Sequence, residues 1–175
     1  VRDAQYRTTY DDARADWLEQ QATEAFRRLW PDAQIGWSLA YGPSARRSEL
    51  DCLILRGNKA IIIECKWKSL TLVARRGDSN ALRKDIAQSI LNAFEQGRRA
   101  RDYIRARTTA EFTAIDGIVL KVDSQAVNEI VILSVLARGA LSLIAANPLE
   151  ARALGLFRDA ELPWALSLFD LLAVC

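Results

Sequence analysis

The sequence contains no histidine and no methionine. Without histidine the chain cannot form a Ser-His-Asp or Cys-His triad, a histidine-based zinc hydrolase site or a histidine general base. Any chemistry must therefore use carboxylates, lysine or a metal ion that carboxylates bind. Without methionine there is no initiator residue, so we expect residues 1–175 to be a single domain excised from a longer protein.

Cysteines are few, and no segment has the composition of a membrane anchor. Cys52, Cys65 and Cys175 lie in or beside apolar runs without C-x-x-C spacing, which favours buried thiols in a reducing cytoplasm. There is no charged-then-apolar leader and no apolar run of membrane-spanning length. We therefore expect a cytoplasmic protein without a membrane partner. The formal net charge of +2 means that a nucleic-acid partner must be argued from local clusters.

Apolar periodicity and turn residues predict the secondary structure. We expect helices over residues 9–30, 81–107 and 148–157, and after residue 168 to the end of the chain. We expect strands over residues 35–41, 48–56, 59–67, 129–137 and 164–168. Residues 70–80 are expected to form a polar loop, residues 112–123 a strand or an irregular excursion, and residues 140–146 are ambiguous. Both faces of the 48–67 region are apolar, which predicts helices on both sides of the sheet and hence an α/β three-layer sandwich.

Gly57-Asn58 is a strong signal for a two-residue hairpin turn. If these two residues form the loop, Asp51 lies directly opposite Glu64, with Cβ atoms roughly 5 Å apart on one face of the sheet. Lys66 lies two residues beyond Glu64 and shares that face. A longer loop would weaken this register argument.

Two carboxylates placed opposite each other inside apolar runs are costly unless a cation or a proton compensates. Magnesium takes one or two carboxylates together with waters and phosphate oxygens, which suits Asp51 and Glu64. Lys66 can orient a water or balance charge on a phosphoryl group. The alternative is a strand-end ion pair between Lys66 and Glu64, with Asp51 in solvent. The register, the apolar surroundings and the missing histidine together favour the metal site.

Three segments carry a resemblance to a known family: Glu49-Leu50-Asp51, the Gly57-Asn58 turn, and residues 61–66 ending in Glu64-Cys65-Lys66. They resemble the PD-(D/E)XK nuclease signature in its nuclease-related (NERD-like) and resolvase-like branches, over about half the chain up to Tyr103. The resemblance implies a restriction-endonuclease-like core with a mixed central sheet, a Mg²⁺ or Mn²⁺ cofactor, and hydrolysis of DNA by a metal-activated water. Leu50 replaces the proline of the motif, and the C-terminal third shows no match.

The resemblance also implies roles for individual residues. Asp51 and Glu64 would bind the metal, with the backbone carbonyl of Cys65 as a further ligand, and Lys66 would position the attacking water. Such nucleases often place a glutamate on the first helix near the metal, which makes Glu19 an expected further metal-site residue. They also often carry a glutamine on the helix after the E-x-K strand, where Gln96 would hold a water or a phosphate. On helical wheels, Glu19 lies near the apolar stripe whereas Glu24 points away, and Gln96 flanks its stripe whereas Gln88 faces away. An ordinary surface glutamate remains the alternative for Glu19.

Arginines supply the local clusters that a phosphate backbone needs. We expect Arg75 and Arg76 in the loop after the E-x-K strand, and Arg98, Arg101 and Arg105 on one flank of the long helix, to contact nucleic acid. A solvated helix face is the alternative for such a run.

The sequence therefore predicts a metal-dependent nuclease domain with DNA as the expected substrate. The main alternative is a non-catalytic nucleic-acid-binding or interaction module of the same fold. A third possibility is an unrelated α/β domain, in which Asp51, Glu64 and Lys66 would not converge. The sequence leaves open whether the substrate is DNA or RNA, its strandedness and any sequence preference. It also leaves open the oligomeric state, for which a dimer is one possibility.

Overall fold

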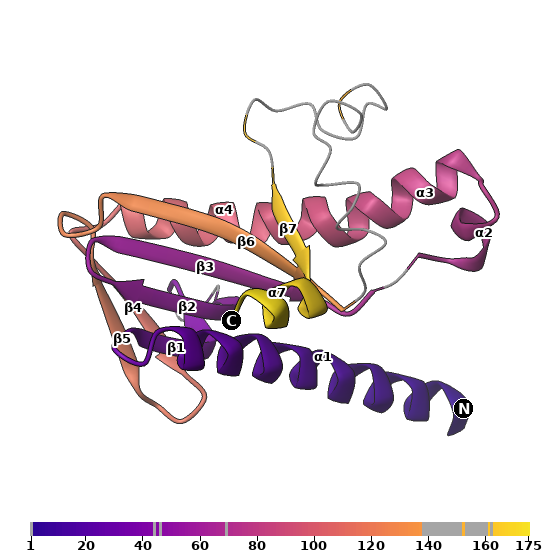
Figure 1. Ribbon diagram of the computed structural model, residues 1–175. Coiled ribbons are helices and arrows are strands. Elements are labelled where there is room, and N and C mark those ends of the chain that lie inside the picture. The colour runs from indigo at the N-terminus through magenta and orange to yellow at the C-terminus, as the bar shows by residue number, and fades with distance from the viewer. Residues whose placement is uncertain are drawn as a thin grey trace.

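The computed structural model describes residues 2–43, 45, 47–68, 70–137, 152, 161 and 163–175, with side chains from residue 9 onward. Within these residues the protein is a mixed α/β protein with a seven-stranded mixed sheet on which helices pack (Figure 1). The segments expected at residues 140–146 and 148–157 lie outside the described residues, apart from residue 152.

The sheet runs in the order β5, β4, β1, β2, β3, β6, β7. These strands are β1 (Gln34–Tyr41), β2 (Ser48–Arg56), β3 (Lys59–Lys66), β4 (Thr109–Ala114), β5 (Val119–Asp123), β6 (Glu129–Leu136) and β7 (Trp164–Ser167). Neighbouring strands are antiparallel except β3 with β6 and β6 with β7, which are parallel. The strands expected at 35–41, 48–56, 59–67, 129–137 and 164–168 are thus confirmed.

The segment 112–123 is neither one strand nor irregular, because it divides between the two strands of the β4–β5 hairpin. The amide of Gly117 donates to the carbonyl of Ala114 at 2.9 Å, and Gly117 has a φ of 83° that favours glycine. The predicted hairpin between β2 and β3 has the expected two-residue turn, with Arg56 facing Lys59 and Cys52 facing Ile63.

The helices are α1 (Arg2–Leu29), α2 (Leu72–Arg75), α3 (Ser79–Ile86), α4 (Asn92–Arg105) and α7 (Leu168–Val174), with a π-helical segment at Ala87–Leu91 between α3 and α4. The helix expected at 81–107 is therefore interrupted by one wider turn. The loop expected at 70–80 contains α2, because the Thr71 hydroxyl accepts a hydrogen bond from the amide of Ala74 and caps it. Within the described residues, no helix has the length and apolar composition needed to cross a bilayer.

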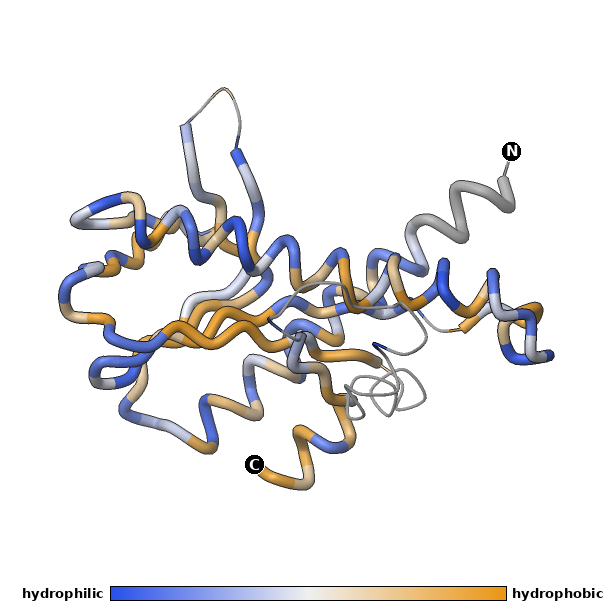
Figure 2. The backbone as a smooth tube through the Cα atoms, turned by 90° about the horizontal axis from the view of Figure 1, so that it is seen from above, coloured by the Kyte–Doolittle hydropathy of each residue, from blue (hydrophilic) through white to orange (hydrophobic). Residues whose placement is uncertain are grey.

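Helices pack on both faces of the sheet (Figure 1). On one face α1 and α7 bury side chains that include Leu18, Phe26 and Leu171 against the sheet. On the other face α4 buries Phe94 and Ile104 in a second core. In Figure 2 the hydrophobic colour accordingly follows the central strands between the helices.

Gly97 lets α4 approach the sheet closely. A Cβ atom at Gly97 would lie 2.4 Å from Cγ2 of Ile132 and 3.4 Å from Cγ2 of Ile62. Any side chain here would push α4 away from β3 and β6. The height of α4 above the end of β3 therefore depends on this glycine.

Candidate functional site

The candidate site lies where β2 and β3 stop pairing. Their ladder ends at Cys52 and Ile63, whereas β3 pairs with β6 along its whole length, from Lys59 to Lys66. The amide of Cys65 instead donates a 2.6 Å hydrogen bond to Oδ2 of Asp51. The Asp51 carboxylate thus lies against the main chain of β3 at this opening. α1 and α3 both extend past this end of the sheet, on opposite sides of it (Figure 1).

The backbone opposite Asp51 adopts an unusual conformation. In β1, Trp37 pairs with Cys52 and Leu39 with Leu50, so Ser38 lies opposite Asp51. Ser38 has a φ of 49°, which costs a non-glycine residue roughly 1–3 kcal/mol and is common at functional sites.

This bend reverses the faces of both strands. In β1, Ile35 packs in the core under α1, whereas Leu39, four residues later, packs in the core under α4. In β2, Leu50 and Leu53 lie in the same core although a regular strand would send residues three apart to opposite faces. The reversal falls at Ser38 and Asp51. The direction of the Asp51 side chain therefore depends on this local bend, which the hairpin register alone does not predict.

Glu64 is buried without full hydrogen bonding. The residue is 1 % exposed, and its Oε2 accepts a 3.3 Å hydrogen bond from Nζ of Lys66. Its Oε1 is buried with no hydrogen-bond partner among the described residues. Burial, followed by the nearby Asp51 charge, raises the pKa of Glu64 to about 8, while Lys66 and Arg99 oppose this shift. A buried carboxylate in this position calls for a cation or a proton.

Lys66 is the cationic neighbour of three carboxyl groups. Burial raises the pKa of Asp51, and Lys66 and the Cys65 amide oppose that shift. Burial, followed by the Asp51 charge, raises the pKa of Glu19 to about 7, again against Lys66. The structure therefore brings Glu19, Asp51, Glu64 and Lys66 together. Glu24, by contrast, forms surface ion pairs with arginines of its own helix.

The ion-pair alternative describes only part of this arrangement. Lys66 does pair with Glu64 at 3.3 Å. Asp51, however, does not extend into solvent, because it is partly buried and bound to the Cys65 amide.

Two hollows flank the cluster. The first, of about 540 Å³, is lined by Asp16, Glu19, Arg47, Glu49 and Asp51 together with residues of β1 and of the β4–β5 turn. The second, of about 390 Å³, is lined by Lys66, Gln88, Asn92, Glu95, Gln96 and Arg99. The cluster can thus be approached from the α1 side and from the α4 side.

Gln96 lies where it was expected, beside Lys66, and its Oε1 is buried without a hydrogen-bond partner among the described residues. Gln88 was expected to face away, but it lines the same hollow and accepts a hydrogen bond from the ammonium group of Lys68. The π-helical segment explains this error, because Gln88 lies within it and its wider turn shifts Gln88 around the helix axis relative to a regular wheel.

Arg99 is the site residue that sequence reasoning missed. It lines the second hollow, and its charge lowers the pKa of Glu64. Burial raises the pKa of Tyr41, while the Ser48 hydroxyl and the Arg99 guanidinium act in the opposite direction. The sequence does contain a signal for Arg99, because Arg99 follows Gln96 by three residues and therefore lies on the same side of the helix.

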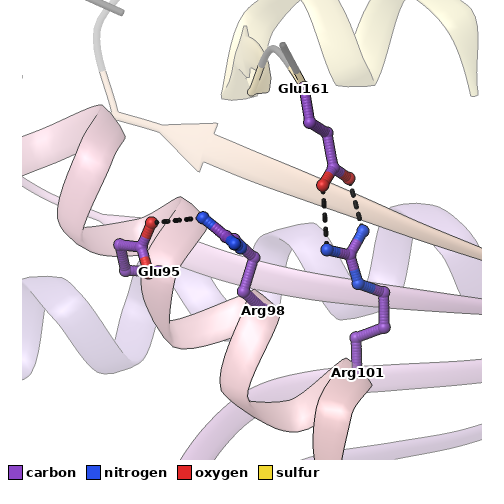
Figure 3. Close-up of polar contacts among 4 residues, drawn as sticks. All are labelled: Glu95, Arg98, Arg101 and Glu161. Atoms are coloured by element: carbon purple, nitrogen blue, oxygen red, sulfur yellow. Dashed lines mark hydrogen bonds and ion pairs between the residues drawn. The ribbon is translucent and has the colours of Figure 1, made fainter. Parts of the chain in front are cut away.

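Two other arginines of this helix, Arg98 and Arg101, are engaged with carboxylates (Figure 3). Arg98 pairs with Glu95 at 3.0 Å. Arg101 is 9 % exposed and forms a two-pronged ion pair with Glu161, with Nη2 at 2.8 Å from Oε2. The expectation that Arg101 contacts a phosphate backbone is therefore corrected, since its guanidinium is buried and bound to a carboxylate. Arg75, Arg76 and Arg105 are exposed.

The donor set suits a two-carboxylate cation site. Among the residues that the structure describes, no group of three or more His, Cys, Asp or Glu side chains is arranged to hold a metal ion, so Glu19 does not join Asp51 and Glu64 as a third carboxylate ligand. Oδ1 of Asp51 and Oε1 of Glu64 are not used by the hydrogen bonds above. The N–H and C=O of one strand residue point to the same side, so the Cys65 carbonyl also faces the Asp51 side. Magnesium needs no more than one or two carboxylates, so the pair fits it.

Comparison of the chain with protein-family models, with curated proteins and with solved structures gives no match.

Proposed function

We propose that this chain is a Mg²⁺- or Mn²⁺-dependent nuclease that hydrolyses phosphodiester bonds, with DNA as the expected substrate. One observation carries the proposal. Asp51, Glu64 and Lys66 meet where β2 and β3 separate, and buried Glu64 keeps one oxygen without a hydrogen-bond partner in the described structure. A cation bound by the two carboxylates would remove the cost of this arrangement.

The architecture supports the same proposal. Antiparallel β1, β2 and β3 are followed by parallel β6, with α1 on one face and α4 on the other. We infer a three-layer α/β/α sandwich with a restriction-endonuclease-like core, in which the site occupies one end of the central strands.

Each residue of the cluster has a chemical task in this proposal. Asp51 and Glu64 would hold the metal through the oxygens that their hydrogen bonds leave available, with the Cys65 carbonyl as an added ligand. The ion would supply Lewis acidity and a more acidic water. Lys66 orients the water that attacks phosphorus and balances charge on the phosphoryl oxygens as the bond to the leaving sugar oxygen breaks. Gln96 holds a water or a phosphate oxygen, and Glu19 carries a proton that it can exchange near neutral pH.

The test is cleavage of plasmid, single-stranded and branched DNA by the purified protein with Mn²⁺. Lys66→Ala should lower the cleavage rate by about 100-fold or more while DNA binding persists, because Lys66 acts mainly on the transition state. Asp51→Asn should also abolish cleavage. Lys59→Ala is the matched control, since Lys59 lies at the other end of β3 and pairs with Glu129.

Two results would count against the proposal. A wild type that binds DNA but cuts no nucleic acid with any divalent ion would favour the non-catalytic module of the same fold. Equal cleavage by wild type, Lys66→Ala and Asp51→Asn would show that the activity does not belong to this cluster.

A further inference from the structure

The two hollows beside the candidate site differ in charge. The α1-side hollow carries the carboxylates of Asp16, Glu19, Glu49 and Asp51 with Arg47 as counter-charge. The α4-side hollow carries Lys66, Arg99 and three amide side chains, while its acidic member, Glu95, is paired with Arg98. A polyanion is repelled by the first surface and attracted by the second.

Arg99 is placed to face a ligand in the α4-side hollow. It is exposed on α4, and its charge acts on both Glu64 and Tyr41. The Tyr41 ring is buried against Tyr103 and Phe112, with ring centroids 4.9 Å and 5.3 Å away. Arg99 therefore lines the hollow while it lies close to Glu64 and to this buried aromatic cluster.

The remaining lining groups suit a nucleotide. Gln88, Asn92 and Gln96 present amides that can donate to and accept from sugars or bases. Oε1 of Gln96 is buried and has no protein partner in the described structure. Lys68 adds positive charge at the rim, because its ammonium group contacts Gln88. A volume of about 390 Å³ falls within the range of small-molecule sites.

We propose that the α4-side hollow is a nucleotide subsite, in which Arg99 binds the phosphate next to the scissile one and the amides contact its sugar or base. The proposal rests on the proposed function, because that function puts the scissile phosphate at Asp51 and Glu64. Arginine suits this task, since its guanidinium can bind two phosphate oxygens at once. The substrate strand then leaves the metal centre along α4 rather than along α1.

The experiment measures binding of thymidine 5′-monophosphate, thymidine 3′-monophosphate and thymidine to the full chain in EDTA by calorimetry. At least one monophosphate should bind more tightly than thymidine. Arg99→Ala should weaken that binding by about 10-fold or more, as expected for a hydrogen bond to a charged group, and Arg99→Lys should restore part of it. Arg28→Ala is the matched control, because Arg28 is an exposed arginine of α1 paired with Glu24.

Three results would overturn the subsite: no binding of either monophosphate, thymidine binding as tight as monophosphate binding, or unchanged binding in Arg99→Ala. A DNA-cleavage assay distinguishes failure of the subsite from failure of the proposed nuclease function. If wild type and Arg99→Ala cut DNA with the same KM, the subsite fails and the nuclease stands. If Arg99 binds the monophosphate but no DNA is cut, the nuclease fails and the hollow stands only as a nucleotide-binding site, without a neighbouring scissile phosphate.

Discussion

Glu64 shows most clearly how the fold changes the chemistry of a single residue. It is buried at the end of β3, with Lys66 bound to one carboxylate oxygen and no partner for the other in the described structure. Its pKa of about 8 and the pKa of about 7 for Glu19 both lie above the ordinary value of 4.5. The folded metal-free protein therefore holds protons that the unfolded chain releases at lower pH.

This difference predicts that the metal-free protein becomes less stable as pH rises. Between about pH 5 and 8 the folded state binds more protons than the unfolded state, so the free energy of unfolding falls with pH. Glu64→Gln should reduce the fall in the free energy of unfolding across this pH range by roughly 1 kcal/mol or more. Urea unfolding in EDTA at several pH values measures it. Glu24→Gln, on the exposed side of α1, is the control, and identical slopes in wild type and Glu64→Gln would contradict the prediction.

α4 is the element whose position matters most for the site. It carries Gln96 and Arg99 beside Lys66, and its distance from the sheet depends on the missing side chain at Gly97. Alanine is the better helix former by up to about 1 kcal/mol, so propensity and packing oppose each other at this position.

In Gly97→Ala we expect the packing cost to exceed the gain in helix propensity. The new methyl group would meet Cγ2 of Ile132, a branched side chain with little freedom to move, and overpacking costs about 1–3 kcal/mol. We expect a net loss of stability in chemical denaturation, with weaker activity because α4 shifts. Asp102→Ala, on the exposed side of the same helix, should not destabilise in this way. Equal or greater stability of Gly97→Ala would show that α4 moves without cost.

The loop after β3 is tied to α3 and presents Arg75 and Arg76 to solvent. The Thr71 amide donates a 2.7 Å hydrogen bond to Oδ2 of the buried Asp85, and Lys68 lies 3.9 Å from the other oxygen. A loop held in this way can offer its arginines to a phosphate backbone at a defined place.

Salt dependence of DNA binding tests which arginines contact the backbone. Each lost phosphate contact should flatten the log–log salt slope by about one unit. Arg75→Ala/Arg76→Ala should flatten it more than Arg98→Ala/Arg101→Ala, because Arg101 is committed to Glu161. The second double variant should mainly lose stability. Unchanged slopes in both variants would place the backbone on another surface.

At the scale of the molecule, four elements contribute to one cluster. Glu19 comes from α1, Asp51 from β2, Glu64 and Lys66 from β3, and Gln96 from α4. A ligand that binds this cluster needs the folded chain, so it should stabilise the whole domain.

Mg²⁺ or Mn²⁺ should therefore raise the melting temperature. A concentration near 100 times Kd corresponds to about 2.7 kcal/mol, or roughly 5–10 °C for a domain of this size. Asp51→Asn should remove the metal-induced gain, although it can stabilise the metal-free protein by relieving like-charge repulsion. Thermal unfolding with and without EDTA measures this, and an equal gain in wild type and Asp51→Asn would place the ion elsewhere.

Residue order alone is enough to predict the features that depend on neighbouring residues. The Gly57-Asn58 turn sets the β2–β3 register, and apolar periods place most elements. The register also brings Asp51 and Glu64 to the same end of the hairpin, although the ladder ends at Cys52 and Ile63, one pair short of the expected Asp51–Glu64 pairing. These follow from local sterics and from the burial of apolar side chains, which residue order encodes directly.

Which polar groups face the cluster follows from the folded structure and not from the sequence pattern. The commitment of Arg101 to Glu161 depends on a segment distant in the sequence, and the left-handed conformation of Ser38 and the π-helical turn before α4 have no signal in the residue pattern used above. Three arginines at positions 98, 99 and 101 look alike in a sequence, but a helix points successive residues in different directions. The packing of α4 on β3 and β6 fixes the rotation of the helix about its axis. In this orientation Arg99, and neither Arg98 nor Arg101, lines the hollow beside Lys66.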